Sequence, residues 1–150
     1  MIALAASAPA AQSDNLMGTT LAVMQGTCSL LLVGGDDLTR QCSPSVINSA
    51  YRTGRSSFMF GYGGDKVVSF FGQDSVAVGD QATLQVDEIG VATGKEDGTA
   101  KRVPHAVHGT CTYTNPYKGA SRITCRASGA GGNYAVDFVS DGQPPNVTRL

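Results

Sequence analysis

The chain has 150 residues, a length that suits one domain able to bury a hydrophobic core of its own. Its 11 basic and 12 acidic residues give a net charge of −1, and no basic stripe indicates nucleic acid as a partner. Charged residues make up only 15% and glycines number 19, which favours short strands joined by turns over helices.

The first eleven residues are small and apolar. Ala6-Ser7-Ala8 and Ala8-Pro9-Ala10 both match the small-x-small pattern at which export signals are cleaved, although the positive start and long apolar stretch of a complete signal are missing. We interpret residues 1–11 as the remnant of a signal peptide, with a disordered tail as the alternative. Residues 12–150 are then a single β domain. No other apolar run has the length of a transmembrane helix.

One motif occurs twice, each time followed by a second cysteine at the same distance. Gly26-Thr27-Cys28 precedes Cys42, and Gly109-Thr110-Cys111 precedes Cys125. We interpret the pattern as an internal repeat, about 22–75 and 106–142, of two duplicated hairpin units. Each unit should hold its own disulfide, because residues opposed in a hairpin are close enough to be bridged. Crosswise pairing and a zinc site are the alternatives, although the close cysteine spacing of zinc sites is absent.

Counting along each hairpin predicts which residues face one another. A hairpin centred on Gly35 brings the first cysteine pair together and places Leu30 opposite Arg40. A hairpin centred on Lys118 brings the second pair together and places Tyr113 opposite Ile123.

After the first hairpin, Ser43 and Pro44 have the order typical of the N-cap and first position of a helix. The apolar residues that follow have helical spacing. They predict one short helix over 44–51, with a loop as the alternative; these residues are Val46, Ile47, Ala50 and Tyr51.

Alternating or β-rich runs predict the strands, and 94–99 reads as a surface loop. Nine short strands with one helix indicate an all-β fold, either a β-sandwich or a partly open barrel. The expected strands are 19–25, 28–33, 38–42, 57–61, 66–71, 82–92, 102–114, 121–127 and 134–139.

The two histidines, His105 and His108, are the candidates for chemistry, as a metal site with Asp137 or Asp141 or as part of a small hydrolase. On a strand they should point to opposite faces. We therefore expect no catalytic residue, no metal and no cofactor.

Tyrosine and arginine gather in the second repeat, and this pair of residue types is typical of interaction hot spots. Ordinary strand residues are the alternative interpretation. The absence of Trp argues against a sugar ligand. The predicted binding residues are Tyr113, Asn115, Tyr117, Arg122, Arg126 and Tyr134.

Paired cysteines favour an oxidising compartment, so we expect a periplasmic or secreted protein. The functional hypothesis is an exported binding module that acts on a partner protein, as an inhibitor or accessory subunit would. A structural or assembly component of the cell envelope is the first alternative, and a small hydrolase using His105 or His108 is the second.

Overall fold

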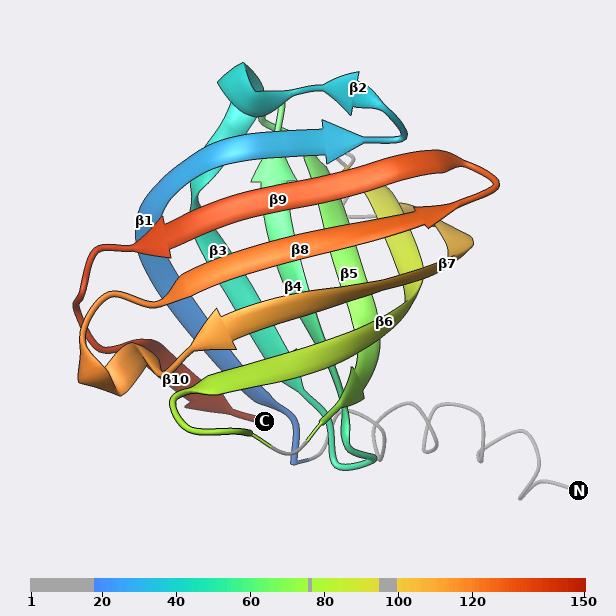
Figure 1. Cartoon of the computed structure of the whole chain (residues 1–150). Helices are drawn as coiled ribbons and strands as arrows, with labels where there is room; N and C mark the ends of the chain where they lie inside the picture. The colour runs from blue at the N-terminus through green and yellow to red at the C-terminus, as the bar shows by residue number, and fades with distance from the viewer. Residues whose placement is uncertain (1–17, 76, 95–99) are drawn as a thin grey trace, which may run out of the picture.

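The computed structural model describes residues 18–75, 77–94 and 100–150 (Figure 1). The predicted signal remnant at 1–11 and most of the predicted loop at 94–99 lie outside the described residues.

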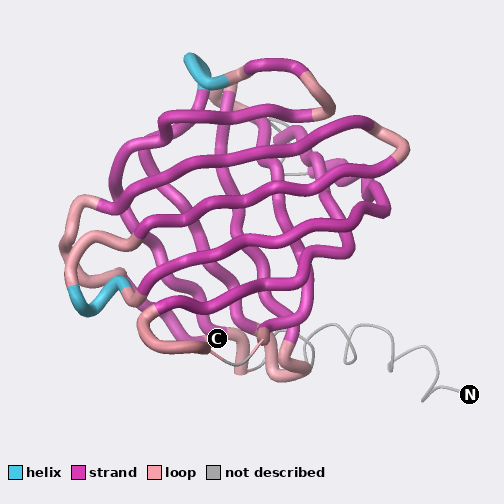
Figure 2. Tube along the Cα trace, in the orientation of Figure 1, coloured by secondary structure: helices cyan, strands magenta, loops and turns pink. Residues whose placement is uncertain are grey.

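Eight antiparallel strands form one closed barrel, in which each strand pairs with the next along the chain and β9 pairs back onto β1 (Figures 1 and 2). This is the up-and-down barrel architecture. The expectation of a sandwich or a partly open barrel is corrected by the β1–β9 pairing, which joins the two ends of the sheet. The eight strands are β1 (Thr20–Val33), β3 (Cys42–Ala50), β4 (Arg55–Tyr62), β5 (Lys66–Asp74), β6 (Gln81–Gly94), β7 (Ala100–Thr114), β8 (Arg122–Gly129) and β9 (Gly132–Ser140).

Two short strands and two 3-10 turns complete the described structure. The strands β2 (Asp36–Asp37) and β10 (Asn146–Arg149) both pair with β1. The 3-10 turns are η1 (Thr39–Gln41), which precedes β3, and η2 (Pro116–Lys118), which joins β7 to β8.

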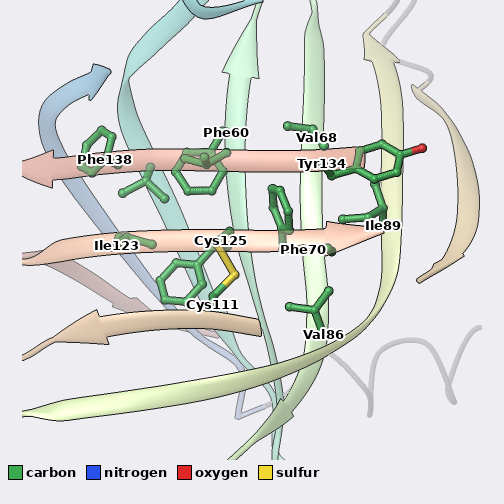
Figure 3. Close-up of a cluster of buried hydrophobic side chains, with 14 of the residues drawn as sticks. Phe60, Val68, Phe70, Val86, Ile89, Cys111, Ile123, Cys125, Tyr134 and Phe138 are labelled. Carbon is green, nitrogen blue, oxygen red and sulfur yellow. A yellow bond between two sulfur atoms is a disulfide. The ribbon is translucent and has the colours of Figure 1, made fainter. Parts of the chain in front are cut away.

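Large apolar side chains fill the barrel interior (Figure 3). Phe60 lies at the centre of an aromatic cluster, with its ring centroid 6.1 Å from those of Phe70 and Phe138. Burial of one such ring is worth about 3 kcal/mol or less against exposure. The interior of an eight-stranded barrel is just wide enough to be filled by side chains. Aliphatic side chains that pack around the rings without solvent exposure include Leu31, Val46, Val68, Leu84, Ile89, Ile123 and Val136.

The predicted helix at 44–51 is wrong, because residues 44–50 belong to β3 and Tyr51 directly follows that strand. Val46 points into the core with no exposure, and the next residue, Ile47, points outward with 36% exposure. Their partners on β4 are Phe60 and Met59, so inward and outward residues alternate across both strands. The β-branched Val46 and Ile47 favour an extended chain, and Asn48 is a weak helix former. The ladder to β4 therefore outweighs the helix-like start.

The second predicted disulfide is confirmed with its predicted geometry. Cys111 on β7 lies directly opposite Cys125 on β8, with Cα atoms 4.0 Å apart and both side chains fully buried. Tyr113 lies opposite Ile123, as the hairpin count predicts.

The first predicted disulfide forms, but its strands do not pair as predicted. Cys28 and Cys42 are bonded with Cα atoms 6.1 Å apart, yet Cys28 lies opposite Phe138 of β9 and Cys42 opposite Tyr62 of β4. The ladder between β1 and β3 ends at Gln25, so this bond joins chain segments that no ladder holds together.

A local side-chain hydrogen bond explains why the simple hairpin count fails there. Asp37 accepts hydrogen bonds from the backbone N–H of Thr39, at 3.1 Å, and from its hydroxyl. This Asx turn starts η1 and removes Arg40 from the sheet, so the predicted pairing of Leu30 with Arg40 is wrong. Leu30 instead lies opposite Asp137.

The glycine of each repeated motif lies against the backbone of the neighbouring strand. A Cβ atom on Gly26 would lie 2.1 Å from the carbonyl oxygen of Val139, and one on Gly109 would lie 2.0 Å from that of Arg126. Both positions therefore require glycine so that the strands can approach closely. Close strand packing therefore explains the glycine of the repeated Gly-Thr-Cys motif. The duplication of 22–75 and 106–142 stays a prediction.

The two disulfides close loops of equal length, because both span a sequence separation of 14. Variants that lack one or the other should therefore lose the same loop-closure entropy and differ in the burial of the removed sulfur atoms. Replacing either pair by alanines should lower the free energy of unfolding by about 3 kcal/mol through the loop-closure term. The Cys111/Cys125 pair should cost about 1 kcal/mol more, because its sulfur atoms leave a cavity in the core. Urea unfolding measures both values, and an equal or larger loss for Cys28/Cys42 would contradict this account.

Gly109→Ala should destabilise the barrel, because its Cβ atom has to displace the backbone of β8. We expect a loss of about 1–3 kcal/mol in the free energy of unfolding. The matched control is Gly61→Ala on β4, whose Cβ atom would meet nothing closer than 3.6 Å. The control should be neutral or slightly stabilising, and similar losses in both variants would show that Gly109 has no special role.

Candidate binding site at the open end of the barrel

The barrel wall is interrupted at the end where β7 finishes and β10 begins (lower left of Figure 1). Pairing between β7 and β8 starts at Tyr113 and Ile123. On the other side, the first residues of β1 pair with β10 and not with β9. Beyond the start of β8, the segment that contains η2 forms no ladder with β10, whose pairing in the described chain is with β1.

Two serine residues hold the edge of this interruption. Ser121 donates its backbone N–H to the Ser140 hydroxyl at 2.7 Å, and the Ser121 hydroxyl donates to the carbonyl oxygen of Thr114 at 2.6 Å. Ser121 and Ser140 are both buried. The chain that enters and leaves η2 is thus fixed to β7 and β9.

A cavity of about 360 Å³ lies at this interruption, within the range of sites that take a small molecule or a side chain. Its lining is mostly apolar and comes from six segments of the chain, so no single element makes the site. The lining includes Met24, Asn48, Phe58, Tyr113, Tyr117, Val147 and Arg149.

Tyr113 forms part of the inner wall of this cavity and is held by two contacts. Its ring packs edge-on against Phe58, with centroids 4.9 Å apart, and its hydroxyl donates to Asp74 at 3.3 Å. Asp74 also accepts a hydrogen bond of 2.9 Å from the Ser56 hydroxyl. Burial, reinforced by the negative charge of Asp74, raises the pKa of Tyr113 to about 12. Tyr113 is therefore a neutral hydrogen-bond donor at neutral pH.

Tyr117 lies on the outer side of the same cavity with 64% of its surface exposed. The Asn115 side chain accepts the backbone N–H of Tyr117 at 2.9 Å, and Pro116 occupies the first position of η2. Lys118 forms an ion pair with Asp80 at 3.1 Å. These contacts hold the backbone of the turn, while the Tyr117 ring stays accessible.

A second hollow, of about 270 Å³, lies beside the first. Tyr113, Pro116 and Tyr117 line both hollows, and Asp80 and Ala82 belong to the second alone. The two tyrosines therefore contribute to two adjoining recesses.

Asn48 and Arg149 are among the polar side chains that line the first cavity. Asn48 reaches it from β3 and donates to the carbonyl oxygen of Ser57 at 2.9 Å, which fixes its orientation. Arg149 lies on β10 and forms no ion pair with any residue that the structure describes. The rim thus carries one positive charge available to a ligand.

Of the six predicted binding residues, Tyr113, Asn115 and Tyr117 line the recesses at this end. Arg122 begins β8 at the same end, where its backbone N–H donates to the Thr114 hydroxyl at 2.9 Å, but it lines neither recess. Arg122 and Arg126 share strand parity, as predicted, and both are exposed on β8. Arg126 donates to the carbonyl oxygens of Cys125 and Val136, at 2.8 and 3.1 Å, and forms an ion pair with Asp137 at 3.0 Å. These contacts tie β8 to β9.

Tyr134 is buried near the start of β9 (Figure 3) and lines neither recess beside η2. Its ring centroid lies 6.2 Å from that of His105. His105 pairs with Ile89 in the ladder and is half-buried, whereas His108 is exposed and borders a hollow with Arg126. Among the described residues, no group of three or more His, Cys, Asp or Glu side chains is placed to hold a metal ion.

Several lining residues were not predicted from the sequence. Asn48 lies in the segment that was predicted to be a helix, and Val147 and Arg149 lie in a strand that was not expected. Val147 and Thr148, two residues that favour strands, follow the turn residues Pro144-Pro145-Asn146 and are the signal that could have indicated β10.

Comparison with known proteins adds no relative to this picture: no family model, curated protein or solved structure matches the chain. The fold and the cavity define the class that can be stated, a closed eight-stranded β-barrel with two disulfides and a recess at one end.

Tyr113 should produce one tyrosinate step near pH 12 in an absorbance titration of the folded protein. Its folded pKa is raised above the ordinary value of 10.0, so this group contributes stability that is present below pH 10 and is lost as the pH rises through about 12. The step should vanish in Tyr113→Phe and move to lower pH in Asp74→Asn, which removes the neighbouring charge. A step that survives in Tyr113→Phe would assign it to another tyrosine.

Proposed function

We propose that the protein is an exported binding module that captures a partner protein at the open end of its barrel. The observation that carries the proposal is the exposed Tyr117 ring, held by a fixed turn directly beside an apolar cavity of about 360 Å³. A partner would insert an apolar side chain into the cavity and cover the Tyr117 ring.

The site is ordered before a partner binds, which lowers the entropic cost of association. Tyrosine supplies a large contact area with few rotatable bonds, and tyrosine is frequent among the residues that dominate binding energy. The turn around Tyr117 is already held by Asn115, Pro116 and the Lys118–Asp80 ion pair. Less conformational entropy is therefore lost on association than for a loose loop.

Recognition is favoured over hydrolysis by the positions of the two histidines. His105 faces the barrel interior near Tyr134, whereas His108 is exposed beside Arg126. They cannot act together on one substrate, and neither lines the cavity at the open end.

The two disulfides fit a protein that is exported or that resides in an oxidising compartment. We extend this to a periplasmic or secreted location as part of the proposal. In the part of the chain that the structure describes, no helix is long and apolar enough to cross a membrane.

The test uses a displayed library of random peptides, selected on the intact, oxidised chain. Enriched peptides are synthesised with a fluorescent label, and dissociation constants are measured by anisotropy. Tyr117→Ala should weaken binding by about 30-fold or more, as expected for a hot-spot residue, while the melting temperature stays nearly unchanged because the ring is exposed.

The matched control is Val103→Ala, which also removes an exposed apolar side chain but lies toward the opposite end of β7. It should change the dissociation constant by about twofold or less. If the peptides bind the Tyr117→Ala variant as tightly as the parent chain, the recognition site lies elsewhere and the proposed function is wrong.

A further inference from the structure

The strand β10 offers a free edge to a second chain. The backbone N–H of Leu150 donates to the carbonyl oxygen of Thr19 at 2.9 Å, so Leu150 points its backbone groups toward β1. Backbone direction alternates along an antiparallel strand. Thr148 therefore also points toward β1, and Val147 and Arg149 point their N–H and C=O groups away from it.

Those outward backbone groups form no hydrogen bond to the described residues, and all four residues of β10 are exposed. Other stretches of the described chain also pair on one side only, among them residues 100–106 of β7 and the middle of β1. The edge of β10 differs from these because it borders the cavity at the open end. Unpaired edges are where a sheet accepts another strand.

The side chains of the same two residues line the cavity. Val147 lies opposite Ala22, and Arg149 lies opposite Thr20, and all four residues contribute to the cavity lining. The free backbone groups and the apolar recess are thus supplied by the same residues. Extended-peptide recognition needs this combination, because main-chain hydrogen bonds supply affinity while pockets for alternate side chains supply specificity.

The positive charge of Arg149 at the rim of the cavity indicates which second side chain a partner segment would carry besides the apolar one. Arg149 has no carboxylate partner among the described residues, and it lies two positions from Val147. Residues on a paired strand face their opposites with the same two-residue period. An acidic residue two positions from the apolar residue would therefore lie against Arg149.

We propose that the partner is captured as an extended segment that adds to β10 as an extra strand, with an apolar side chain in the cavity and an Asp or Glu two residues away facing Arg149. This inference rests on the proposed function and specifies the chemistry of the partner segment. A small apolar molecule would fill the cavity without using the backbone groups of Val147 and Arg149.

The first experiment removes one backbone donor from the free edge. Val147→Pro deletes the outward N–H, and proline is tolerated on an edge strand when its missing donor faces solvent. Val147→Ala keeps the N–H and shortens the side chain, so it is the matched control. With the labelled peptides selected on the parent chain, Val147→Pro should weaken binding at least about tenfold more than Val147→Ala. Circular dichroism checks that both variants remain folded.

A measurement on the unmodified chain keeps the proposal testable if Val147→Pro does not fold. Hydrogen exchange followed by NMR should show that the amides of Val147 and Arg149 gain protection when the peptide is bound. The amide of Thr148, which already points toward β1, should change much less. Protection confined to η2 would contradict strand addition.

The charge is tested with Arg149→Gln and peptides whose acidic residue is replaced by Gln. Arg149→Gln should weaken binding of the acidic peptide about fivefold and leave binding of the Gln peptide unchanged. The control Arg40→Gln, at the exposed η1, should change the binding of neither peptide. Equal effects of Arg149→Gln on both peptides would overturn the charge pairing.

The outcomes separate this inference from the proposed function. Peptides that need Tyr117 but bind Val147→Pro as well as Val147→Ala would leave the proposed function standing and overturn strand addition. No enrichment of peptides on the parent chain would overturn both. A parent chain that sediments as a dimer and a Val147→Pro variant that sediments as a monomer would identify a second copy as the occupant, which also overturns the proposal.

Discussion

The pairing of β1 with both β3 and β9 is the constraint on which the rest of the structure depends. β1 uses its first residues, up to Gln25, to pair with β3, and its residues from Gly26 onward to pair with β9. This division closes the sheet and places Leu31 in the core. It also leaves the start of β1 without a barrel strand on one side, where β10 pairs with it. The recess at the open end is therefore a consequence of how the barrel closes.

The two disulfides share a spacing but stabilise different features. Cys111 and Cys125 are opposed within a continuous ladder, so their bond reinforces pairing that hydrogen bonds already provide. Cys28 and Cys42 lie beyond the last rung between β1 and β3, where η1 has taken the chain out of the sheet. Their bond therefore holds β1 to the start of β3 where no ladder does so. Equal spacing in a sequence does not establish equal geometry, because side-chain hydrogen bonds such as that of Asp37 change the path of the chain.

Local alternation made much of the fold predictable, and long-range pairing made the rest unpredictable. Strands from β4 to β9 were expected because each of these runs either alternates or is rich in residues that favour strands. β3 was missed because Ser43 and Pro44 also match the start of a helix, and only the ladder to β4 decides between the two. Closure depends on contacts such as Leu31 with Val136, which no local pattern indicates. For the same reason Tyr113, Asn115 and Tyr117 could be proposed from turn chemistry, whereas Asn48 and Arg149 reach the cavity only after closure.

A filled core and an exposed edge together limit what this barrel can bind and how. Phe58, Phe60, Phe70 and Phe138 occupy the interior, so the recess for a ligand lies at an end and not in the middle. An exposed edge strand carries a risk of unspecific association, and short length and neighbouring prolines are ways to reduce that risk. β10 has only four residues and directly follows Pro144-Pro145. In the proposed complex, an edge this short supplies few main-chain hydrogen bonds, so most of the binding energy would come from the cavity and the Tyr117 ring. Selectivity would then follow, because only segments whose side chains fit the recess would gain enough energy to stay bound.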